Sequence, residues 1–233
     1  MKSYTEINAL DGKGEEFLAY TSQPVAPPKA AIVVIQEIFG VNEGIRAKCD
    51  EWAAKGYLAI APDLFWRIRP GIELDADVPE QLQEAFGLIG QFDQEAGIRD
   101  IEATIREARS MVGGGKVGAV GYCLGGRLAY MTAARTDINA SVGYYGVGLE
   151  GLLGESHAIA HPLMLHIAVD DGFVPPEAQK AVHAGLGDHP KVTLLDYPGV
   201  DHGFAAQMGK RRVEAAARLA DSRTEEFFAQ HLA

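Results

Sequence analysis

The chain has 233 residues, of which 47% are hydrophobic, and its formal net charge is −11. A chain of this length and apolar content can fold around a full core, and a single domain spanning residues 1–233 is the simplest expectation. The acidic balance argues against nucleic acid and against an anionic membrane as partners. It does not exclude an anionic small substrate, because local basic residues can still attract one.

The first residues and the cysteines indicate the cellular compartment of the protein. The first residues lack an apolar core of signal-peptide length, and no run approaches the length of a membrane span. The two cysteines, Cys49 and Cys123, are too few for a disulfide framework and lie in separate predicted elements. We therefore expect a cytoplasmic protein, because a reducing compartment keeps unpaired thiols free.

In chain order, strand and helix patterns alternate. Prolines 24, 27 and 28 separate a hairpin-like N-terminal region from the first buried strand. Short apolar runs predict strands at 30–35, 57–61, 117–120, 141–145, 163–169 and 192–197. Helical patterns occupy 42–55, 79–93, 95–112, 124–135, 176–187 and 211–230. Such alternation predicts an α/β fold with a doubly wound, mostly parallel sheet and helices on both faces.

Residues 116–126, Lys-Val-Gly-Ala-Val-Gly-Tyr-Cys-Leu-Gly-Gly, carry the strongest functional signal. A β-branched run meets Gly121, Cys123 and Gly125, and a helical segment follows at once. This is the strand, sharp turn and helix of a nucleophile elbow, with cysteine in the nucleophile's place. The N-terminus of the following helix would favour a thiolate at Cys123. The alternative is a glycine-rich turn with a structural cysteine. Cys49, in contrast, shares an apolar helix face with Ile45 and Trp52 and is expected in the core.

A thiol nucleophile needs a base, and His202 is the best placed of the seven histidines. It lies in a turn-rich loop directly after the predicted strand 192–197. His166 falls inside an apolar strand and is expected as a hydrogen-bonded core residue. No two histidines have the spacing of a metal site, so we expect no metal.

An acid that orients the histidine should stand between nucleophile and base in the chain. Asp170 and Asp171 follow the predicted strand 163–169, and either could reach His202. Asp171 is preferred because it lies in the loop beyond the strand end. An Asp-Asp-Gly sequence is by itself ordinary turn chemistry. The positions of Cys123, Asp171 and His202 at successive strand ends argue against a purely structural role for all three.

The loop after the first buried strand adds a fourth polar candidate, Glu37. Alone, it could equally be a surface carboxylate or one half of a structural ion pair. This loop is also where a second oxyanion-hole amide arises in α/β-hydrolases. The expected amide donors are therefore the backbone N–H groups of Ile38 and Leu124.

Taken together, these motifs resemble the dienelactone hydrolase (carboxymethylenebutenolidase) family of the α/β-hydrolase superfamily. The matching segments are 36–42 (Gln-Glu-Ile-Phe-Gly-Val-Asn), 62–64, 121–126, 143–148 and 173–175. The resemblance implies an α/β-hydrolase fold, Cys123 as nucleophile, His202 as general acid and base, and Asp171 as its orienting acid. It also implies that Glu37 helps to deprotonate the thiol when substrate arrives.

The chain departs from the family where the substrate carboxylate would bind. The family's dienelactone enzymes hold that carboxylate with two arginines, whose places here fall at Leu82 and Ala206. Four other arginines could substitute from another direction: Arg67, Arg69, Arg211 and Arg212. The resemblance further implies that Phe39, Tyr145 and Phe173 line the substrate site beside Leu82 and Ala206.

The expected activity is hydrolysis of activated esters or enol lactones through an acyl-thioester, with no cofactor. Two other readings stay open. A catalytically silent ligand-binding protein would be acylated without turnover, and a thiol redox sensor would turn over a peroxide. The sequence makes no prediction of oligomeric state.

Overall fold

The computed structural model describes all 233 residues. Contacts between Cα atoms divide the chain into two compact units. The first comprises Met1–Gly118 and Gln207–Lys210, and the second comprises Ala119–Ala206 and Arg211–Ala233. No helix is long and apolar enough to cross a membrane.

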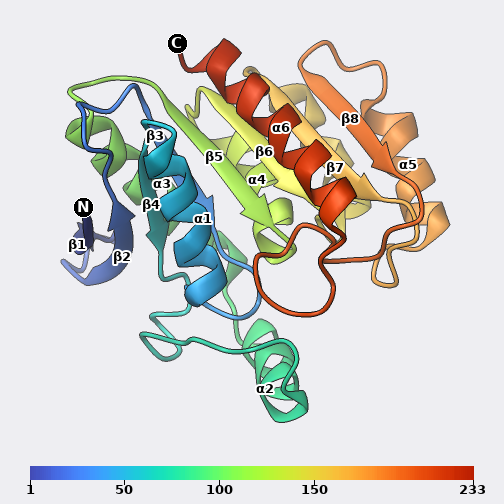
Figure 1. Ribbon diagram of the computed structural model, residues 1–233, viewed down its shortest axis with the longest axis horizontal. Helices are drawn as coiled ribbons and strands as arrows, with labels where there is room; N and C mark the ends of the chain where they lie inside the picture. Colours follow the sequence, from blue (N-terminus) through green and yellow to red (C-terminus); the bar gives the residue numbers. More distant parts are fainter. The chain divides into compact units, whose positions relative to one another are not determined.

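The first unit contains four strands in the spatial order β1-β2-β4-β3. Their bounds are β1 (Lys2–Asn8), β2 (Glu16–Ser22), β3 (Ala31–Ile35) and β4 (Leu58–Pro62). β1 and β2 form the expected N-terminal hairpin, with Lys2 opposite Ser22 (Figure 1). β2 runs antiparallel to β4, whereas β3 and β4 are parallel. Every residue of β3 and β4 is buried, as expected for strands covered on both faces.

Three helices belong to this unit: α1 (Glu43–Ala54), α2 (Pro79–Ile89) and α3 (Gln94–Met111). Asn42 begins α1 by accepting a hydrogen bond from the Ile45 N–H, and Asp93 does the same for the Ala96 N–H in α3. Both α1 and α3 pack against β3 and β4. Cys49 lies on the buried face of α1, which confirms its prediction as a core residue.

The second unit carries the strand order β5-β6-β7-β8, with β6, β7 and β8 parallel. The bounds are β5 (Val117–Tyr122), β6 (Ala140–Tyr144), β7 (Leu163–Ala168) and β8 (Val192–Tyr197), and the chain enters the unit within β5. Its helices are α4 (Leu124–Arg135), α5 (Pro176–Leu186) and α6 (Glu214–His231), with a 3₁₀ segment η1 (Leu149–Ala158).

Helices α4 and α6 cover opposite faces of β6. Ser141 donates its hydroxyl proton to the Ala129 carbonyl of α4, whereas the Tyr144 hydroxyl meets Thr224 of α6. These two strand residues are three positions apart, so their side chains point to opposite faces. Figure 1 shows α6 in front of this part of the sheet, and α6 contacts β6.

The predicted α/β class, the mostly parallel strands and the helices on both faces are confirmed. Most element ends agree to within two residues, but α2 ends at Ile89 rather than at 93 and α6 begins at Glu214 rather than at 211. The sequence did not predict η1, where Gly151 and Gly154 interrupt any helical periodicity.

Candidate active site

The elbow predicted at Cys123 is present as a strained turn between β5 and α4. Cys123 has φ 56° and ψ −114°, a conformation that non-glycine residues rarely adopt. A Cβ atom at Gly121 would lie 1.9 Å from the Gly125 carbonyl oxygen, and one at Gly126 would lie 2.3 Å from that of Tyr144. Glycine at both positions is what allows the turn to close this tightly.

The turn presents Cys123 at the N-terminus of α4. Cys123 is half-buried, and its carbonyl accepts hydrogen bonds from the N–H groups of Gly126 and Arg127. Leu124 is the first residue of α4, so its N–H is one of the donors that a helix start leaves without an intrahelical acceptor. A negative charge at this place is stabilised by such donors and by the helix dipole.

Asp171 and His202 meet in the second unit. Asp171 lies in the loop after β7, and His202 lies in the loop after β8. The His202 Nδ1 atom lies 2.9 Å from Asp171 Oδ2, and the two side chains are only 7% and 1% exposed. The other carboxylate oxygen, Asp171 Oδ1, accepts a hydrogen bond from the Phe173 N–H at 2.8 Å. The carboxylate is therefore fixed on both sides.

Asp201 bonds to backbone N–H groups, whereas Asp171 bonds to the His202 ring. Its Oδ1 atom accepts hydrogen bonds from the N–H groups of Gly172 at 2.8 Å and His202 at 2.6 Å. These backbone bonds, with the positive charge of Arg211, lower the pKa of Asp201. Asp201 thus ties the loop of Asp171 to the loop of His202. The side chain of Asp170 is exposed, while its N–H donates to the Val200 carbonyl.

The electrostatics of His202 favour the imidazolium. Burial alone would lower its pKa, but hydrogen bonds to Asp171 and Cys123 and the negative charges of both groups outweigh burial. The net result is a pKa raised to about 10. Because Nδ1 faces Asp171, the hydrogen bond to Cys123 uses the other ring nitrogen, Nε2. Cys123, His202 and Asp171 are therefore connected in one row.

Two of the predicted substrate-site residues flank this imidazole. The rings of Tyr145 and Phe173 meet the His202 ring edge to face at centroid distances of 5.0 and 4.9 Å. Tyr145 is buried and has a strained φ of 38°, whereas Phe173 is 42% exposed. The guanidinium of Arg211 lies 5.6 Å from the centroid of the Phe173 ring.

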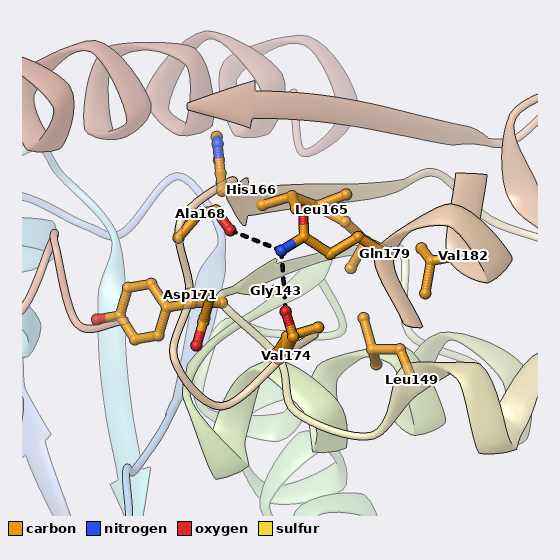
Figure 2. Close-up of a pocket in the computed structure, with 12 residues that line it drawn as sticks. Gly143, Leu149, Leu165, His166, Ala168, Asp171, Val174, Gln179 and Val182 are labelled. Carbon is orange, nitrogen blue, oxygen red and sulfur yellow. Dashed lines mark hydrogen bonds between the residues drawn. The ribbon is translucent and has the colours of Figure 1, made fainter. Parts of the chain in front are cut away.

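Gln179, which sequence reasoning did not single out, supports the loop of Asp171. From α5, its side-chain amide donates to the carbonyls of Ala168, Val169 and Val174. Figure 2 shows two of these bonds beside Asp171. A glutamine on a helix carries no signal of this role in the sequence, because its acceptors lie 5 to 11 residues earlier, at the end of β7 and in the loop that follows.

The remaining site predictions are placed as follows. Glu37, Ile38 and Phe39 occupy the loop after β3 in the first unit, and the side-chain oxygen of Gln36 joins that loop to the Leu64 N–H at 3.0 Å. Leu82 is half-buried in α2. Ala206 is half-buried in the second unit, and its N–H donates to the Gly203 carbonyl.

Of the four arginines that could replace the family's carboxylate-binding pair, three form ion pairs with carboxylates of this protein. Arg67 pairs with buried Asp100, Arg69 with Glu84, and Arg212 with Glu214 at 2.7 Å. Arg211 differs from these three, since its guanidinium lies over the Phe173 ring and its positive charge acts on Asp201. Nowhere do three His, Cys, Asp or Glu side chains gather as a group that could hold a metal ion.

Comparison with known proteins gives the family of the chain. The carboxymethylenebutenolidase of Pseudomonas putida is 41% identical over 217 residues, covering 93% of this chain and 92% of its own. A relative from Azospirillum brasilense is 46% identical over 231 residues, covering 98% and 99%. A crystal structure from Klebsiella pneumoniae matches with a TM-score of 0.84 and 27% identity over 99% of each chain. The model of the dienelactone hydrolase family matches residues 17–232. The chain therefore has an α/β-hydrolase fold and belongs to the dienelactone hydrolase family of hydrolases.

Proposed function

We propose that this protein hydrolyses activated esters or enol lactones, with Cys123 as nucleophile, His202 as general acid and base, and Asp171 as the acid that orients His202. The observation that carries the proposal is the row of hydrogen bonds from Asp171 through His202 to Cys123, with the Asp171 Oδ2 to His202 Nδ1 distance at 2.9 Å. Membership of a hydrolase family supports the same reaction class.

The first step is attack by the thiolate on the substrate carbonyl. A bond forms between Cys123 Sγ and the carbonyl carbon while the carbonyl π electrons move onto oxygen. The Leu124 N–H at the start of α4 is suited to stabilise this oxyanion. By resemblance to the family, the second donor is the Ile38 N–H.

The second step breaks the bond between the acyl carbon and the leaving oxygen. The imidazolium of His202 gives its Nε2 proton to that oxygen, and a thioester remains on Cys123. The raised pKa of His202 supports this role, because the ring carries the proton at neutral pH. Asp171 accepts from Nδ1 throughout and keeps the ring in one orientation.

The third step is hydrolysis of the thioester. Neutral His202 takes a proton from water through Nε2 as the water oxygen bonds to the acyl carbon. Collapse of this intermediate expels the thiolate, which regenerates the pair of thiolate and imidazolium. A thiolate leaves more readily than an ordinary alkoxide, so the acylation step favours enol and aryl esters over amides and alkyl esters.

Family resemblance assigns Glu37 to thiol activation when substrate arrives, and Phe39, Leu82, Tyr145, Phe173 and Ala206 to the substrate site. The ring contacts of Tyr145 and Phe173 with His202 support the assignment of those two residues. Glu37→Gln should lower turnover with little change in folding, because it removes a charge and keeps the shape.

The deciding experiment is a hydrolysis panel of enol lactones, aryl esters and alkyl esters, combined with mass spectrometry of the enzyme quenched during turnover. We expect hydrolysis of the enol and aryl substrates and an acyl adduct on the peptide that contains Cys123. Cys123→Ala should show neither. Turnover without an adduct in wild type, or turnover by Cys123→Ala, would count against the thioester route. Acylation without turnover would instead indicate a ligand-binding protein.

A further inference from the structure

A chain of buried hydrogen bonds lies beneath α6, on the opposite face of the sheet from α4. The Tyr197 hydroxyl meets His166 Nδ1 at 2.8 Å, and His166 Nε2 meets Thr224 Oγ1 at 2.9 Å. Thr224 Oγ1 in turn lies 2.6 Å from the Tyr144 hydroxyl. These partners come from β6, β7, β8 and α6, and the side chains of Tyr144, His166 and Thr224 are at most 1% exposed. The proposed reaction uses none of these side chains.

The partners at the two ends of this hydrogen-bond chain determine which groups donate and which accept. At one end the Arg223 guanidinium donates to the Tyr197 hydroxyl at 3.1 Å. At the other end the Tyr144 hydroxyl donates to the Asp221 carboxylate at 3.0 Å. Tyr197 therefore directs its own proton to His166 Nδ1, and His166 Nε2–H donates to Thr224 Oγ1. The Thr224 hydroxyl has two neighbouring acceptors, the Tyr144 hydroxyl at 2.6 Å and the Ala220 carbonyl of its own helix at 3.0 Å. Burial, aided by the charge of Arg223, lowers the pKa of His166 to about 3, which agrees with a neutral ring that has one donor and one acceptor.

The same residues hold the strained backbone of the active site. The Tyr144 carbonyl accepts the Cys123 N–H at 3.1 Å, and the His166 carbonyl accepts the Tyr145 N–H at 2.8 Å. Cys123 and Tyr145 are the two non-glycine residues with positive φ, at 56° and 38°. Strained residues persist only where surrounding structure over-determines them. Cys123 and Tyr145 each donate to the backbone carbonyl of a residue, Tyr144 or His166, whose side chain takes part in the hydrogen-bond chain beneath α6.

We propose that Tyr144, His166 and Thr224 are positioning residues that hold Cys123 and Tyr145 in their strained conformations, so that the thiol stays directed at His202. Tyr145 packs on the His202 ring, so the same anchor positions both partners of the reaction. The inference rests on the proposed function only in naming Cys123 as the nucleophile. The hydrogen-bond chain and the two strained residues stand without it.

The test uses two variants with matched controls. Thr224→Val removes the central hydroxyl, and Tyr144→Phe removes the hydroxyl that meets Asp221. Thr104→Val is the control for the first, because Thr104 is a buried threonine that bonds within its own helix α3 at 2.7 Å. Tyr20→Phe is the control for the second, because the Tyr20 hydroxyl also donates to an aspartate, Asp50, at 2.9 Å. Thr224→Ser keeps the hydroxyl and should have the kcat and the alkylation rate of the wild type.

The measurements are kcat and KM for an aryl ester, the rate of Cys123 alkylation by iodoacetamide across pH 5–9, and the ¹⁵N shifts of His166. We expect Thr224→Val and Tyr144→Phe to lower kcat about 10- to 100-fold with a smaller change in KM, because small misplacements of reacting groups cost this much. Alkylation below pH 7 should slow in the same two variants. Both controls should lose similar stability and keep the wild-type kcat and alkylation profile. Wild-type His166 should show the Nε2–H tautomer.

Three outcomes would overturn the proposal: unchanged kcat and alkylation in folded Thr224→Val and Tyr144→Phe, equal losses in the controls, or an Nδ1–H tautomer at His166. If one of the two variants does not fold, the other and the Thr224→Ser rescue decide. If wild type hydrolyses no ester, the proposed function fails, whereas alkylation and the His166 shifts still decide this inference.

Discussion

The carboxylate of Asp171 reaches His202 through Oδ2, while its Oδ1 is held by the N–H of Phe173, whose ring packs on the same imidazole. One short loop thus supplies both the partner of His202 Nδ1 and one wall around the ring. The side chain of Gln179 donates to three carbonyls at the two ends of that loop, which braces the loop from within the protein. Asp171 is therefore held ready before a substrate binds.

Asp171→Asn should reduce kcat by about 10³- to 10⁴-fold, because an asparagine amide stabilises the wrong imidazole tautomer and cannot stabilise the imidazolium. Asp170→Asn should change kcat less than about 2-fold, since that side chain is exposed. Asp201→Asn should cost less than about 10-fold, because an amide oxygen still accepts from the Gly172 and His202 N–H groups. Steady-state kinetics of the three folded variants checks this order. A larger loss at Asp170 or Asp201 than at Asp171 would contradict it.

Cys123 should be the only thiol required for turnover. Cys123→Ala should abolish ester hydrolysis, and Cys123→Ser should be far weaker than wild type, because the site is built for a thiolate. Cys49→Ala should keep near-wild-type turnover and lose on the order of 1 kcal/mol of stability through a small cavity in the core. Burial raises the pKa of Cys49, so that thiol stays protonated and inert. Kinetics and denaturant unfolding separate the two effects, and equal loss of turnover in folded Cys49→Ala would overturn the assignment.

Local patterns in the sequence predicted most of the fold and the positions of the site. The glycines around Cys123 predicted the elbow because the sharp turn leaves no room for a Cβ atom at 121 or 126. His202 and Asp171 could be placed because each follows a strand whose apolar run is evident. Loop position favours Asp171 over Asp170 as the partner of His202, and the Asp171 carboxylate is the one that lies 2.9 Å from the His202 ring.

The supporting contacts could not be predicted because they join segments far apart in the chain. Tyr144 and Thr224 are separated by 80 residues, and His166 and Thr224 by 58. His166 was correctly expected as a hydrogen-bonded core residue, but no local pattern named its partners. The same is true of Arg67, which pairs with Asp100 across 33 residues. This ion pair engages the guanidinium that is a candidate, from the sequence alone, for binding a substrate carboxylate.

His202 should make stability depend on pH above neutrality. Its pKa is raised from 6.5 to about 10 in the folded protein. The folded state therefore binds this proton more tightly than the unfolded state does. The resulting stabilisation is fully present below about pH 6.5. It is lost as pH rises through about 10.

Urea unfolding of wild type and His202→Gln between pH 6 and 10.5 measures this contribution. The difference in free energy of unfolding between the two proteins should shrink steadily as pH rises. Titrating groups that do not interact with His202 cancel in the difference. A difference that stays constant or grows with pH would show that the folded protein does not hold the imidazolium.

The last prediction concerns selectivity for a substrate carboxylate. By resemblance, Leu82 and Ala206 stand where the family's dienelactone enzymes carry arginines, so we expect no strong clamp for an anionic substrate. A substrate that bears a free carboxylate and its methyl ester should therefore have specificity constants within about 100-fold of each other, which corresponds to about 2.7 kcal/mol. Steady-state kinetics on this matched pair makes the measurement. A preference for the carboxylate above that value would contradict the prediction.

Arg211 is the residue to test if a preference is found, because Arg67, Arg69 and Arg212 are already paired with carboxylates. Its guanidinium stacks on Phe173, and the Phe173 ring contacts the imidazole of His202. Arg211→Ala should then reduce the preference for the carboxylate about 10-fold or more, the size of one charge-assisted hydrogen bond, while kcat/KM for the methyl ester stays within about 2-fold. Arg212→Ala is the matched control and should leave the ratio unchanged, because Arg212 pairs with Glu214. A preference that survives in Arg211→Ala would exclude this cation as its source.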